Sequence, residues 1–291
     1  ANRDLRDWIK SVEEIGQLQR IEGAERTREI GGIVDWFQEE MGTPALLFDR
    51  IPGYPAGYRV LANSLISKER IALTLGLPPQ NRSMAIVRFW RDFLKGGKRI
   101  PPRTVSTGRV LENVLRGPDV DVRAFPTPVW HEEDGGPYIG TGCLVIQQDP
   151  DTGWVNLGCY RVQTFDRDSL GIMITAGRHG DAILKKYWEK GKPCPIAISV
   201  GHDPLLLIAA GLQIPWGVSE YDVAGAIRGE PVEVVPGPVT GLPVPANAEI
   251  VIEGDISPGD LRDEGPFGEW TGYYASGVRP QPVIRVRSVL F

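Results

Sequence analysis

The amino-acid sequence predicts an α+β fold in two parts: an N-terminal α/β domain over residues 1–110 and an antiparallel split β-barrel over residues 111–291. Two observations predict it. Apolar residues recur at helical spacing through much of the first part, whereas short strand-like runs dominate after about residue 110. A chain of 291 residues is also long enough to bury two cores.

The first part is expected to open with an amphipathic helix and to continue with strands and helices. In the opening helix, apolar residues recur every three or four positions: Leu5, Trp8, Ile9, Val12 and Ile15. We then expect a strand over 18–21, a second amphipathic helix over 30–41, strands over 45–48 and 58–62, and helices over 68–75 and 85–94. The stretch 97–107 contains two consecutive prolines and is predicted to be a linker.

The second part is expected to consist mainly of strands, with helices inserted among them. Strands are predicted over 139–148, 154–165, 172–175, 196–200, 232–235, 249–253 and 283–290. The turn 149–153 contains Pro150 and Gly153 and predicts a hairpin between the first two of these strands. Because side chains alternate along a strand, two sets are expected on opposite faces: Asn156, Gly158 and Tyr160 on one, and Leu157, Cys159 and Arg161 on the other.

Composition and charge narrow the choice of partner. The net charge is −5, and lysine and arginine are scattered without a basic run, which argues against nucleic acid. The apolar run 205–212 is too short to span a membrane, and no secretory signal is visible at the start. Three cysteines without metal-binding spacing predict buried, reduced thiols in a cytoplasmic protein. A small-molecule enzyme fits these properties.

The stretch 264–269 (EGPFGE) places two carboxylates five residues apart on a loop. Its glycines and proline disfavour a helix and permit tight or left-handed backbone, so that Glu264 and Glu269 can be aimed at one point. A pair of carboxylates held in this way is suited to proton transfer. The alternative is a surface turn with two solvated acids.

Three polar residues could together form a metal site. Asn156, His179 and Glu220 offer an amide oxygen, an imidazole nitrogen and a carboxylate oxygen, a set that suits Mn²⁺ or Mg²⁺ better than Zn²⁺. Spacing alone does not show that the three meet, and each has a structural alternative, as a hairpin hydrogen-bonding group, a residue at a helix start and an acid in a first turn. The stretch 131–136 is predicted to be a solvated acidic turn.

Three motifs occur in the order in which one known family carries them. They are residues 2–9 (NRDLRDWI) with 16–18 (GQL), residues 214–220 (IPWGVSE), and residues 264–274 (EGPFGEWTGYY). On these motifs the chain resembles the UbiD-type decarboxylases, which use prenylated FMN. The resemblance runs from end to end, and the last motif is highly specific.

The resemblance implies a set of site residues. A divalent ion, Mn²⁺ or Mg²⁺, would be held against the cofactor phosphate by Asn156, His179 and Glu220, with K⁺ nearby and Glu220 shared between both ions. The expected cofactor contacts are Asn156, Cys159, Tyr160, Arg161, Met173, Ile174, Thr175, Arg178, His179 and Glu220. The catalytic network would consist of Arg161, Glu264 and Glu269, with Glu269 as the proton donor.

The resemblance also implies an activity: non-oxidative, reversible decarboxylation of an aromatic, heteroaromatic or α,β-unsaturated acid, with CO₂ as co-product and a flavin prenyltransferase as cofactor supplier. Members of the family usually continue beyond the last strand into a C-terminal domain that dimerises. That domain is expected to be absent from this sequence, and a full-length form is expected to be a homodimer or a larger homo-oligomer. Two alternatives stay open: a flavin-binding or assembly module without independent turnover, and a split-barrel flavin reductase.

Overall fold

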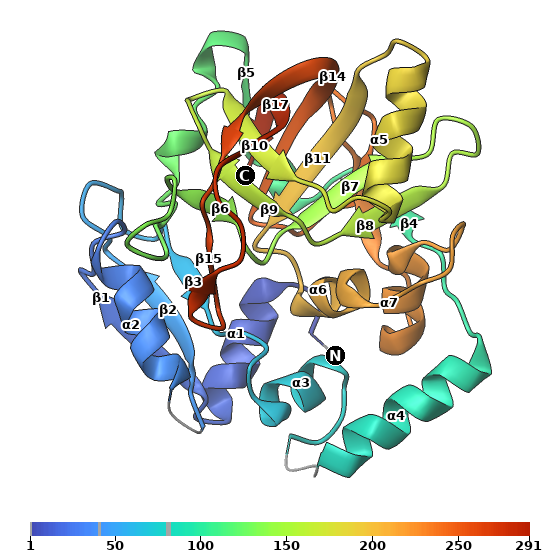
Figure 1. Ribbon diagram of the computed structural model, residues 1–291. Coiled ribbons are helices and arrows are strands. Elements are labelled where there is room, and N and C mark those ends of the chain that lie inside the picture. Colours follow the sequence, from blue (N-terminus) through green and yellow to red (C-terminus); the bar gives the residue numbers. More distant parts are fainter. Residues whose placement is uncertain (1, 40–41, 80–82) are drawn as a thin grey trace.

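A computed structural model of the chain describes residues 2–39, 42–79 and 83–291. The N-terminal lobe, blue to cyan in Figure 1, packs helices against a three-stranded sheet. Its elements are α1 (Leu5–Glu14), β1 (Leu18–Glu22), α2 (Glu29–Gln38), β2 (Ala45–Asp49), β3 (Val60–Ala62) and α3 (Lys68–Thr74). β1 and β2 are parallel, and β3 is antiparallel to β2. The predicted helices and strands of this lobe are confirmed within a few residues; Met41, in the predicted second helix, lies outside the described residues.

Local sequence explains how this lobe is held together. α1 begins after Asp4, whose side chain accepts a hydrogen bond from the N–H of Asp7 at 2.8 Å. Its apolar face buries Trp8, and the Trp8 indole donates to the Thr74 hydroxyl at 2.8 Å. Arg70 is fully buried, and within the described ranges no carboxylate pairs with it. It donates to four oxygens at 2.7 to 2.9 Å, those of the Gln17 side chain and of the Thr43, Asn63 and Ser64 backbone.

The connection between the two parts of the chain contains a helix and a short strand, and both contact the second part. α4 (Ser83–Gly96) lies at the lower edge of the molecule in Figure 1 and packs Phe89, Trp90 and Phe93 against the barrel core. The predicted linker 97–107 contains β4 (Arg103–Thr104), which pairs in parallel with β12 (Glu233–Pro236). The division into domains at residue 110 stays a prediction. β4 precedes this residue but pairs with β12 of the second part.

The second part is built on a nine-stranded curled sheet in which all the pairings are antiparallel. The strand order is β6-β9-β10-β17-β14-β11-β7-β8, with β5 also paired to β17. The strands are β5 (Val114–Arg116), β6 (Tyr138–Gly140), β7 (Leu144–Gln148), β8 (Val155–Gly158), β9 (Arg161–Thr164), β10 (Ser169–Met173), β11 (Cys194–Val200), β14 (Ile250–Glu264) and β17 (Arg279–Leu290). The predicted α+β class with an antiparallel split barrel is confirmed.

The strand predicted over 154–165 is wrong as a single element. β8 ends at Gly158 and β9 begins at Arg161, and the two strands lie towards opposite ends of the strand order. Because the sheet curls, two residues suffice to cross between them. Gly158 permits the crossing, since a Cβ there would lie 2.3 Å from the Tyr160 ring. The strand predicted over 139–148 is likewise divided, into β6 and β7.

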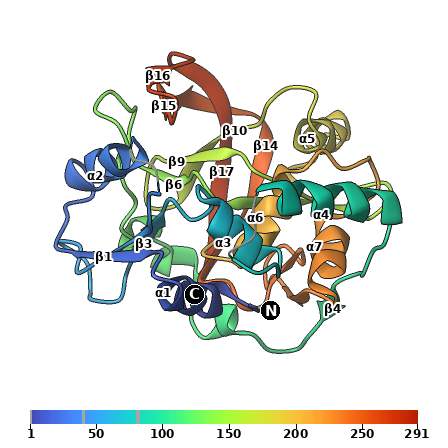
Figure 2. The ribbon, with the colours of Figure 1, turned by 90° about the horizontal axis from the view of Figure 1, so that it is seen from below.

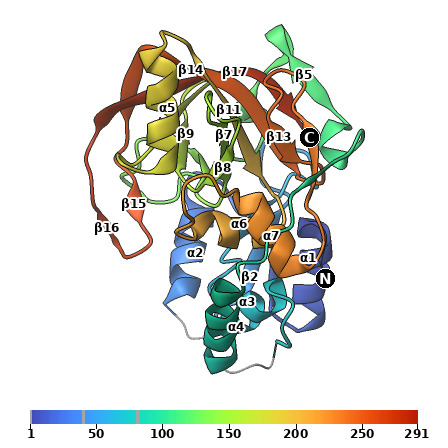
Figure 3. The same ribbon diagram turned by 90° about the vertical axis from the view of Figure 1, so that its right-hand side faces the viewer.

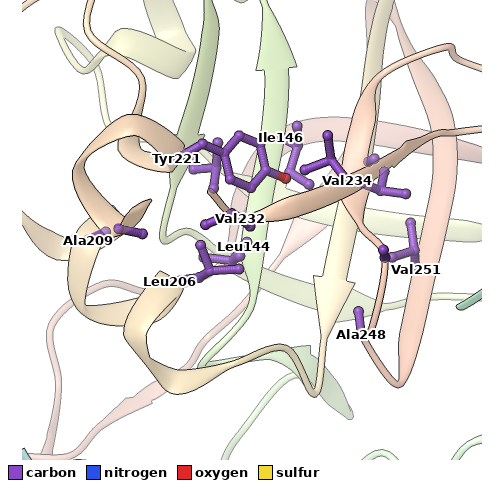
Figure 4. Close-up of a cluster of buried hydrophobic side chains, with 14 of the residues drawn as sticks. Leu144, Ile146, Leu206, Ala209, Tyr221, Val232, Val234, Ala248 and Val251 are labelled. Carbon is purple, nitrogen blue, oxygen red and sulfur yellow. The ribbon is translucent and has the colours of Figure 1, made fainter. Parts of the chain in front are cut away.

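Helices cover both faces of this sheet. α5 (His179–Glu189) packs Ile183 and Leu184 on one face. α6 (Pro204–Gly211) and α7 (Glu220–Arg228) lie on the other face, towards the N-terminal lobe (Figure 3). Figure 4 shows the core beneath α6 and α7, in which Leu144, Ile146, Leu206, Ala209, Tyr221, Val232, Val234, Ala248 and Val251 are labelled. α6 has a capped start: Asp203 accepts from the N–H of Leu205, and Pro204 is the first helical residue.

Small strands and single turns complete the structure. The remaining strands are β13 (Pro243–Pro245), β15 (Gly268–Glu269) and β16 (Tyr273–Tyr274), and the 3₁₀ turns are Arg109–Leu111, Gly117–Asp119 and Val122–Ala124. β14 ends at Glu264, eleven residues beyond residue 253, where the sequence predicts the end of this strand. Together with β17 it forms a long ribbon that carries the β15–β16 hairpin, at the top of Figure 2. Within the described residues, no helix has the length and apolar character needed to cross a bilayer.

Candidate active site

The carboxylate of Glu264 is bound by Arg161 through two parallel hydrogen bonds. Arg161 Nε donates to Oε1 and Nη2 donates to Oε2, each at 2.8 Å. Glu264 is the last residue of β14 and is 1% exposed, while Arg161 opens β9. This bidentate geometry is the strongest ion-pair arrangement that a carboxylate can form with an arginine. Burial lowers the pKa of Arg161, but the hydrogen bond and charge of Glu264 outweigh it, so the pKa is raised.

Glu269 lies on the open side of the same arginine. Its Oε1 is 3.8 Å from Arg161 Nη1, and its side chain keeps 35% of its exposure. The two-residue strand β15 places it there, because Gly268 and Glu269 pair with Tyr274 and Tyr273 of β16. The structure therefore brings the three predicted catalytic residues together, but in unequal environments.

Two further side chains form hydrogen bonds with Glu264 and with Gly265, the residue that follows it. The Tyr138 hydroxyl donates to Glu264 Oε1 at 2.8 Å, and the Tyr138 ring packs on Phe267 with ring centroids 4.4 Å apart. Gln163, paired with Tyr138 across β6 and β9, accepts from the Gly265 N–H at 3.1 Å. Sequence reasoning missed both residues. Their position on strands next to Arg161 becomes informative only when the strand order is known.

The stretch 131–136 forms hydrogen bonds with the loop that carries Glu264 and Glu269. The prediction that this stretch is a solvated turn is wrong for Asp134. The Asp134 side chain is fully buried and accepts from the Gly268 N–H at 2.7 Å. The Gly135 N–H donates to the Pro266 carbonyl at 2.8 Å. A Cβ at Gly135 would lie 2.1 Å from the Gly265 oxygen, so only glycine allows this approach. The backbone that carries Glu269 is therefore fixed on both sides.

A cavity of about 1610 Å³ lies between the N-terminal lobe and the barrel. Its wall includes five of the predicted cofactor contacts together with one of the acids: Cys159, Tyr160, Arg161, Met173, Thr175 and Glu269. The opposite wall comes from α1 and β3, with Arg6, Ile9 and Val60. Small-molecule pockets commonly measure about 300–1,000 Å³, so this cavity has room for a flavin and a second molecule.

The remaining predicted contacts lie around the crossing from β8 to β9. Met173 pairs with Arg161 across β10 and β9, and Ile174 packs against the barrel core. Arg178 is exposed and precedes α5. His179 begins α5, and its ring lies 5.2 Å and 5.3 Å from the rings of Trp154 and Trp216.

The predicted metal ligands provide a partly assembled site. Glu220 Oε2 accepts from the Leu157 N–H at 2.7 Å, which places the carboxylate beside Asn156 on β8. In the described part of the chain, no hydrogen bond or ion pair joins His179 to either residue, and no group of three or more His, Cys, Asp or Glu side chains is arranged to hold a metal ion. The structure thus brings Glu220 next to the strand that carries Asn156, and no contact among the described residues brings His179 to them.

The chemistry of these side chains fits a cation. Glu220 is 3% exposed, and among the described residues no lysine or arginine pairs with it; burial raises its pKa to about 7. The Asn156 amide is buried and could ligate a cation through Oδ1; its Nδ2, which has no partner among the residues that the structure describes, is a donor that needs an acceptor. Burial and the charge of Arg178 lower the pKa of His179, which favours the neutral imidazole that binds metals. A bound cation would satisfy the buried carboxylate.

The family of the chain follows from sequence comparisons. A family model described as the 3-octaprenyl-4-hydroxybenzoate carboxy-lyase Rift-related domain matches residues 103–291, and the model of the N-terminal domain of the same carboxy-lyase matches residues 9–90. Fold and sequence thus agree on one class, the carboxy-lyase type with a split barrel. The chain belongs to the UbiD family.

Two curated relatives illustrate the similarity. Pyrrole-2-carboxylic acid decarboxylase of Pseudomonas aeruginosa is 37% identical over an alignment that covers 99% of this chain and 59% of the relative. Phenolic acid decarboxylase of a Streptomyces species is 35% identical, with coverage of 100% and 62%. The chain therefore spans about three-fifths of the length of these relatives.

Solved structures agree with this assignment. Vanillic acid decarboxylase of Sedimentibacter hydroxybenzoicus in its closed form has a TM-score of 0.92 at 32% identity, over 100% of this chain and 62% of that one. An evolved dimeric form of the UbiD-class enzyme HmfF from Pelotomaculum thermopropionicum, in complex with prenylated FMN, has a TM-score of 0.89 at 32% identity, over 99% and 65%.

Proposed function

We propose that the protein is a decarboxylase that removes CO₂ from an aromatic, heteroaromatic or α,β-unsaturated carboxylic acid, non-oxidatively and reversibly, with prenylated FMN as cofactor. The observation that carries this proposal is the unequal environment of two acids around one arginine at a cavity wall. Relatives named for pyrrole-2-carboxylic and phenolic acids support the substrate class.

The two acids have different tasks because their surroundings differ. Glu264 is buried and receives hydrogen bonds from two Arg161 nitrogens and from Tyr138, all of which stabilise its charged form. Glu269 receives only a 3.8 Å contact from Arg161 and faces the cavity. Glu269 is therefore the acid that can give up a proton.

The reaction assigns one step to each of these groups. Arg161 Nη1, which points to the open side, orients the substrate carboxylate. When bound, prenylated FMN accepts the electron pair that the departing CO₂ leaves behind. The bond between the carbon and the carboxylate breaks, Glu269 donates its proton to that carbon, and water in the cavity reprotonates Glu269. In the carboxylation direction Glu269 removes the proton instead.

The cofactor site would lie at the crossing from β8 to β9. Asn156, His179 and Glu220 would hold Mn²⁺ or Mg²⁺ against the flavin phosphate, with K⁺ beside Glu220. The buried, cation-free carboxylate of Glu220 supports this assignment. Flavin contacts would come from Cys159, Tyr160, Arg161, Met173, Ile174, Thr175 and Arg178. A flavin prenyltransferase would supply the cofactor, and the complete protein would form a homodimer or a larger homo-oligomer.

The test begins with the cofactor. The protein is expressed together with a flavin prenyltransferase, purified without oxygen and denatured, and the released flavin and metal are identified by mass spectrometry. We expect prenylated FMN with Mn²⁺ near one per chain, and CO₂ release from a panel of pyrrole-2-carboxylate, vanillate and other phenolic acids. Plain FMN without metal, together with NAD(P)H oxidation, would support a flavin reductase instead. Bound cofactor without turnover of any acid would identify a binding module.

The role of Glu269 is tested by Glu269→Gln. The amide keeps the shape but cannot donate a proton, so turnover is expected to fall by about 10²–10⁴-fold while the cofactor stays bound. Glu132→Gln, at an exposed acid in the neighbouring turn, is the matched control and should keep the wild-type rate. Decarboxylation by Glu269→Gln at the wild-type rate would exclude Glu269 as the donor.

A further inference from the structure

Tyr138 is a fully buried tyrosine whose hydroxyl lies among three acceptors. Its oxygen is 2.8 Å from Glu264 Oε1, 3.4 Å from the Gln163 side-chain oxygen and 3.5 Å from the Pro266 carbonyl. A phenol has a single proton to donate. The shortest contact is also the one to a carboxylate, and such charge-assisted bonds are the stronger ones, so the proton is directed to Glu264.

The position of this hydroxyl is fixed from several sides. Tyr138 opens β6 and pairs with Gln163 on β9, two residues from Arg161. Its N–H donates to the Pro128 carbonyl at 2.9 Å, and its ring packs on Phe267. Burial, with the hydrogen bond and charge of Glu264, raises the pKa of Tyr138 well above its usual value, so the phenol stays protonated.

We propose that Tyr138 is a positioning residue that keeps Glu264 ionised and seated against Arg161, and so leaves the transferable proton on Glu269. Two of the three donors to Glu264 come from Arg161, which must also face the substrate. The third, Tyr138, is among the residues around the cavity but has no exposed surface of its own, and its hydroxyl is directed to the carboxylate. The proposal rests on the proposed decarboxylase function for its catalytic consequence.

Other charges near Glu264 stay the same when Tyr138 is changed. Arg161 faces Glu264 from β9, Glu269 lies on β15, and Arg279 is paired with Glu264 across β14 and β17. The turn before β6 contributes His131 and Asp134. Asp134 raises the pKa of Tyr138 slightly as a neighbouring charge and donates no hydrogen bond to Glu264. A change in the titration of Glu264 on removal of one hydroxyl is therefore attributable to that hydroxyl.

The test is Tyr138→Phe, with Tyr221→Phe as the matched control. Tyr221 is also fully buried, and its hydroxyl donates to the Pro243 carbonyl at 2.8 Å, pointing into the core beside Val234 (Figure 4). Both variants lose one buried hydroxyl and one hydrogen bond of the same length. Tyr138→Phe should lose more stability than Tyr221→Phe, because its acceptor is a carboxylate and not a neutral carbonyl. The titration of Glu264 and the pH profile, which a buried hydroxyl elsewhere should not affect, therefore decide the comparison.

The first measurement does not depend on activity. The side-chain carboxyl carbons of all glutamates are labelled with ¹³C, and the signal of Glu264 is assigned by its loss in Glu264→Gln. A hydrogen bond to a charged group contributes about 1.5–3 kcal/mol, so in Tyr138→Phe the midpoint of the Glu264 titration should move up by about one pH unit or more. Tyr221→Phe should leave it unchanged. An unmoved Glu264 midpoint in Tyr138→Phe overturns the proposal.

The second measurement is the pH profile of decarboxylation by the holoenzyme. In Tyr138→Phe the acidic limb of kcat should move to higher pH by about the same interval, whereas KM should stay within about twofold, because Tyr138 has no exposed surface to offer a substrate. An unchanged acidic limb overturns the catalytic consequence. If the wild-type protein decarboxylates no acid in the panel, the proposed function fails, and the titration of Glu264 still decides whether Tyr138 holds its charge.

A second substitution covers the case in which Tyr138→Phe does not fold. Incorporation of 3-fluorotyrosine at position 138 keeps the hydroxyl and nearly the same volume but makes the phenol a stronger donor. The Glu264 midpoint and the acidic limb should then move to lower pH, opposite in sign to Tyr138→Phe. A shift to higher pH, or none, would contradict the proposal.

Discussion

Two carboxylates are buried in the same barrel without a lysine or arginine partner among the described residues, and they differ in what satisfies them. Glu253, on β14, is fully buried and accepts from four donors: the N–H groups of Val239 and Thr240 and the hydroxyls of Thr240 and Ser288. Glu220, at the start of α7, accepts a hydrogen bond from the Leu157 N–H at 2.7 Å. One site is complete within the chain, and the other is not.

The surroundings of the two side chains explain this difference. Gly237 makes room for Glu253, because a Cβ there would lie 2.2 Å from Glu253 Oε1, and the loop 237–241 can then close its N–H groups around the carboxylate. Among the residues that the structure describes, no comparable loop closes on Glu220, and burial raises its pKa to about 7. A buried charge that the chain satisfies serves the fold, whereas one that it leaves open is suited to a ligand.

The largest effect on the free energy of unfolding is expected at Glu253, the carboxylate whose hydrogen-bond donors all come from the chain. Glu253→Gln replaces two charged acceptor atoms by one neutral acceptor and an amide that faces N–H and O–H donors. The free energy of unfolding should fall by about 4 kcal/mol, because several charge-assisted bonds are lost in a buried site. Chemical denaturation measures this change. Folded Glu253→Gln protein should still bind Mn²⁺ and flavin with wild-type affinity, and a loss of either would end the distinction between the two sites.

Glu220→Gln should give the reverse pattern. The neutral amide is easier to bury than the carboxylate, so the free energy of unfolding of the ligand-free protein should stay the same or rise. Loss of a residue that only supports a metal ligand typically weakens metal binding by about 10–100-fold. Loss of a charged ligand itself should therefore weaken Mn²⁺ binding by about a hundredfold or more. Calorimetric titration with Mn²⁺ and metal analysis of the purified protein measure this. Unchanged Mn²⁺ affinity would remove Glu220 from the site.

The same contrast explains what the sequence could predict. Amphipathic spacing around Trp8 and the turn 149–153 are local signals, and both predict their elements correctly. The division of 154–165 into two strands was missed, because the crossing at Gly158 depends on a sheet curled enough for two residues to connect β8 with β9. Periodicity carries no information about curvature, so a polar strand with the right alternation was predicted as one element.

The acid loop shows the same limit at the site. Glu264 and Glu269 were found because glycine and proline mark a stiff loop, and Arg161 was assigned by resemblance. Tyr138 and Asp134 were missed, because they act across the fold, more than 120 residues from the loop in sequence. Asp134 in particular has the local sequence of a solvated turn, and only the close approach permitted by Gly135 buries its carboxylate.

A smaller effect extends the comparison to a buried base. His202 lies between β11 and α6, is 4% exposed, and its Nδ1 is 3.2 Å from the Ser199 carbonyl, which makes Nδ1 the donor. Burial lowers the pKa of His202 to about 4, from 6.5. The unfolded chain therefore takes up this proton below about pH 6.5, whereas the folded protein resists it until about pH 4. The stabilisation is complete above pH 6.5 and is lost as the pH falls towards 4.

Between pH 7 and pH 5 this group should cost the wild-type protein about 2 kcal/mol of its free energy of unfolding. His202→Gln keeps a donor for the Ser199 carbonyl but does not titrate, so the difference in stability between wild type and variant should shrink by that amount over the same range. His131, His179 and Glu220 are present in both proteins, and their contributions cancel in the difference. Like Glu253, His202 is satisfied by the chain alone, so added Mn²⁺ should leave this pH-dependent difference unchanged. If added Mn²⁺ changed this difference in stability, His202 would belong with Glu220 among the buried groups that a ligand completes.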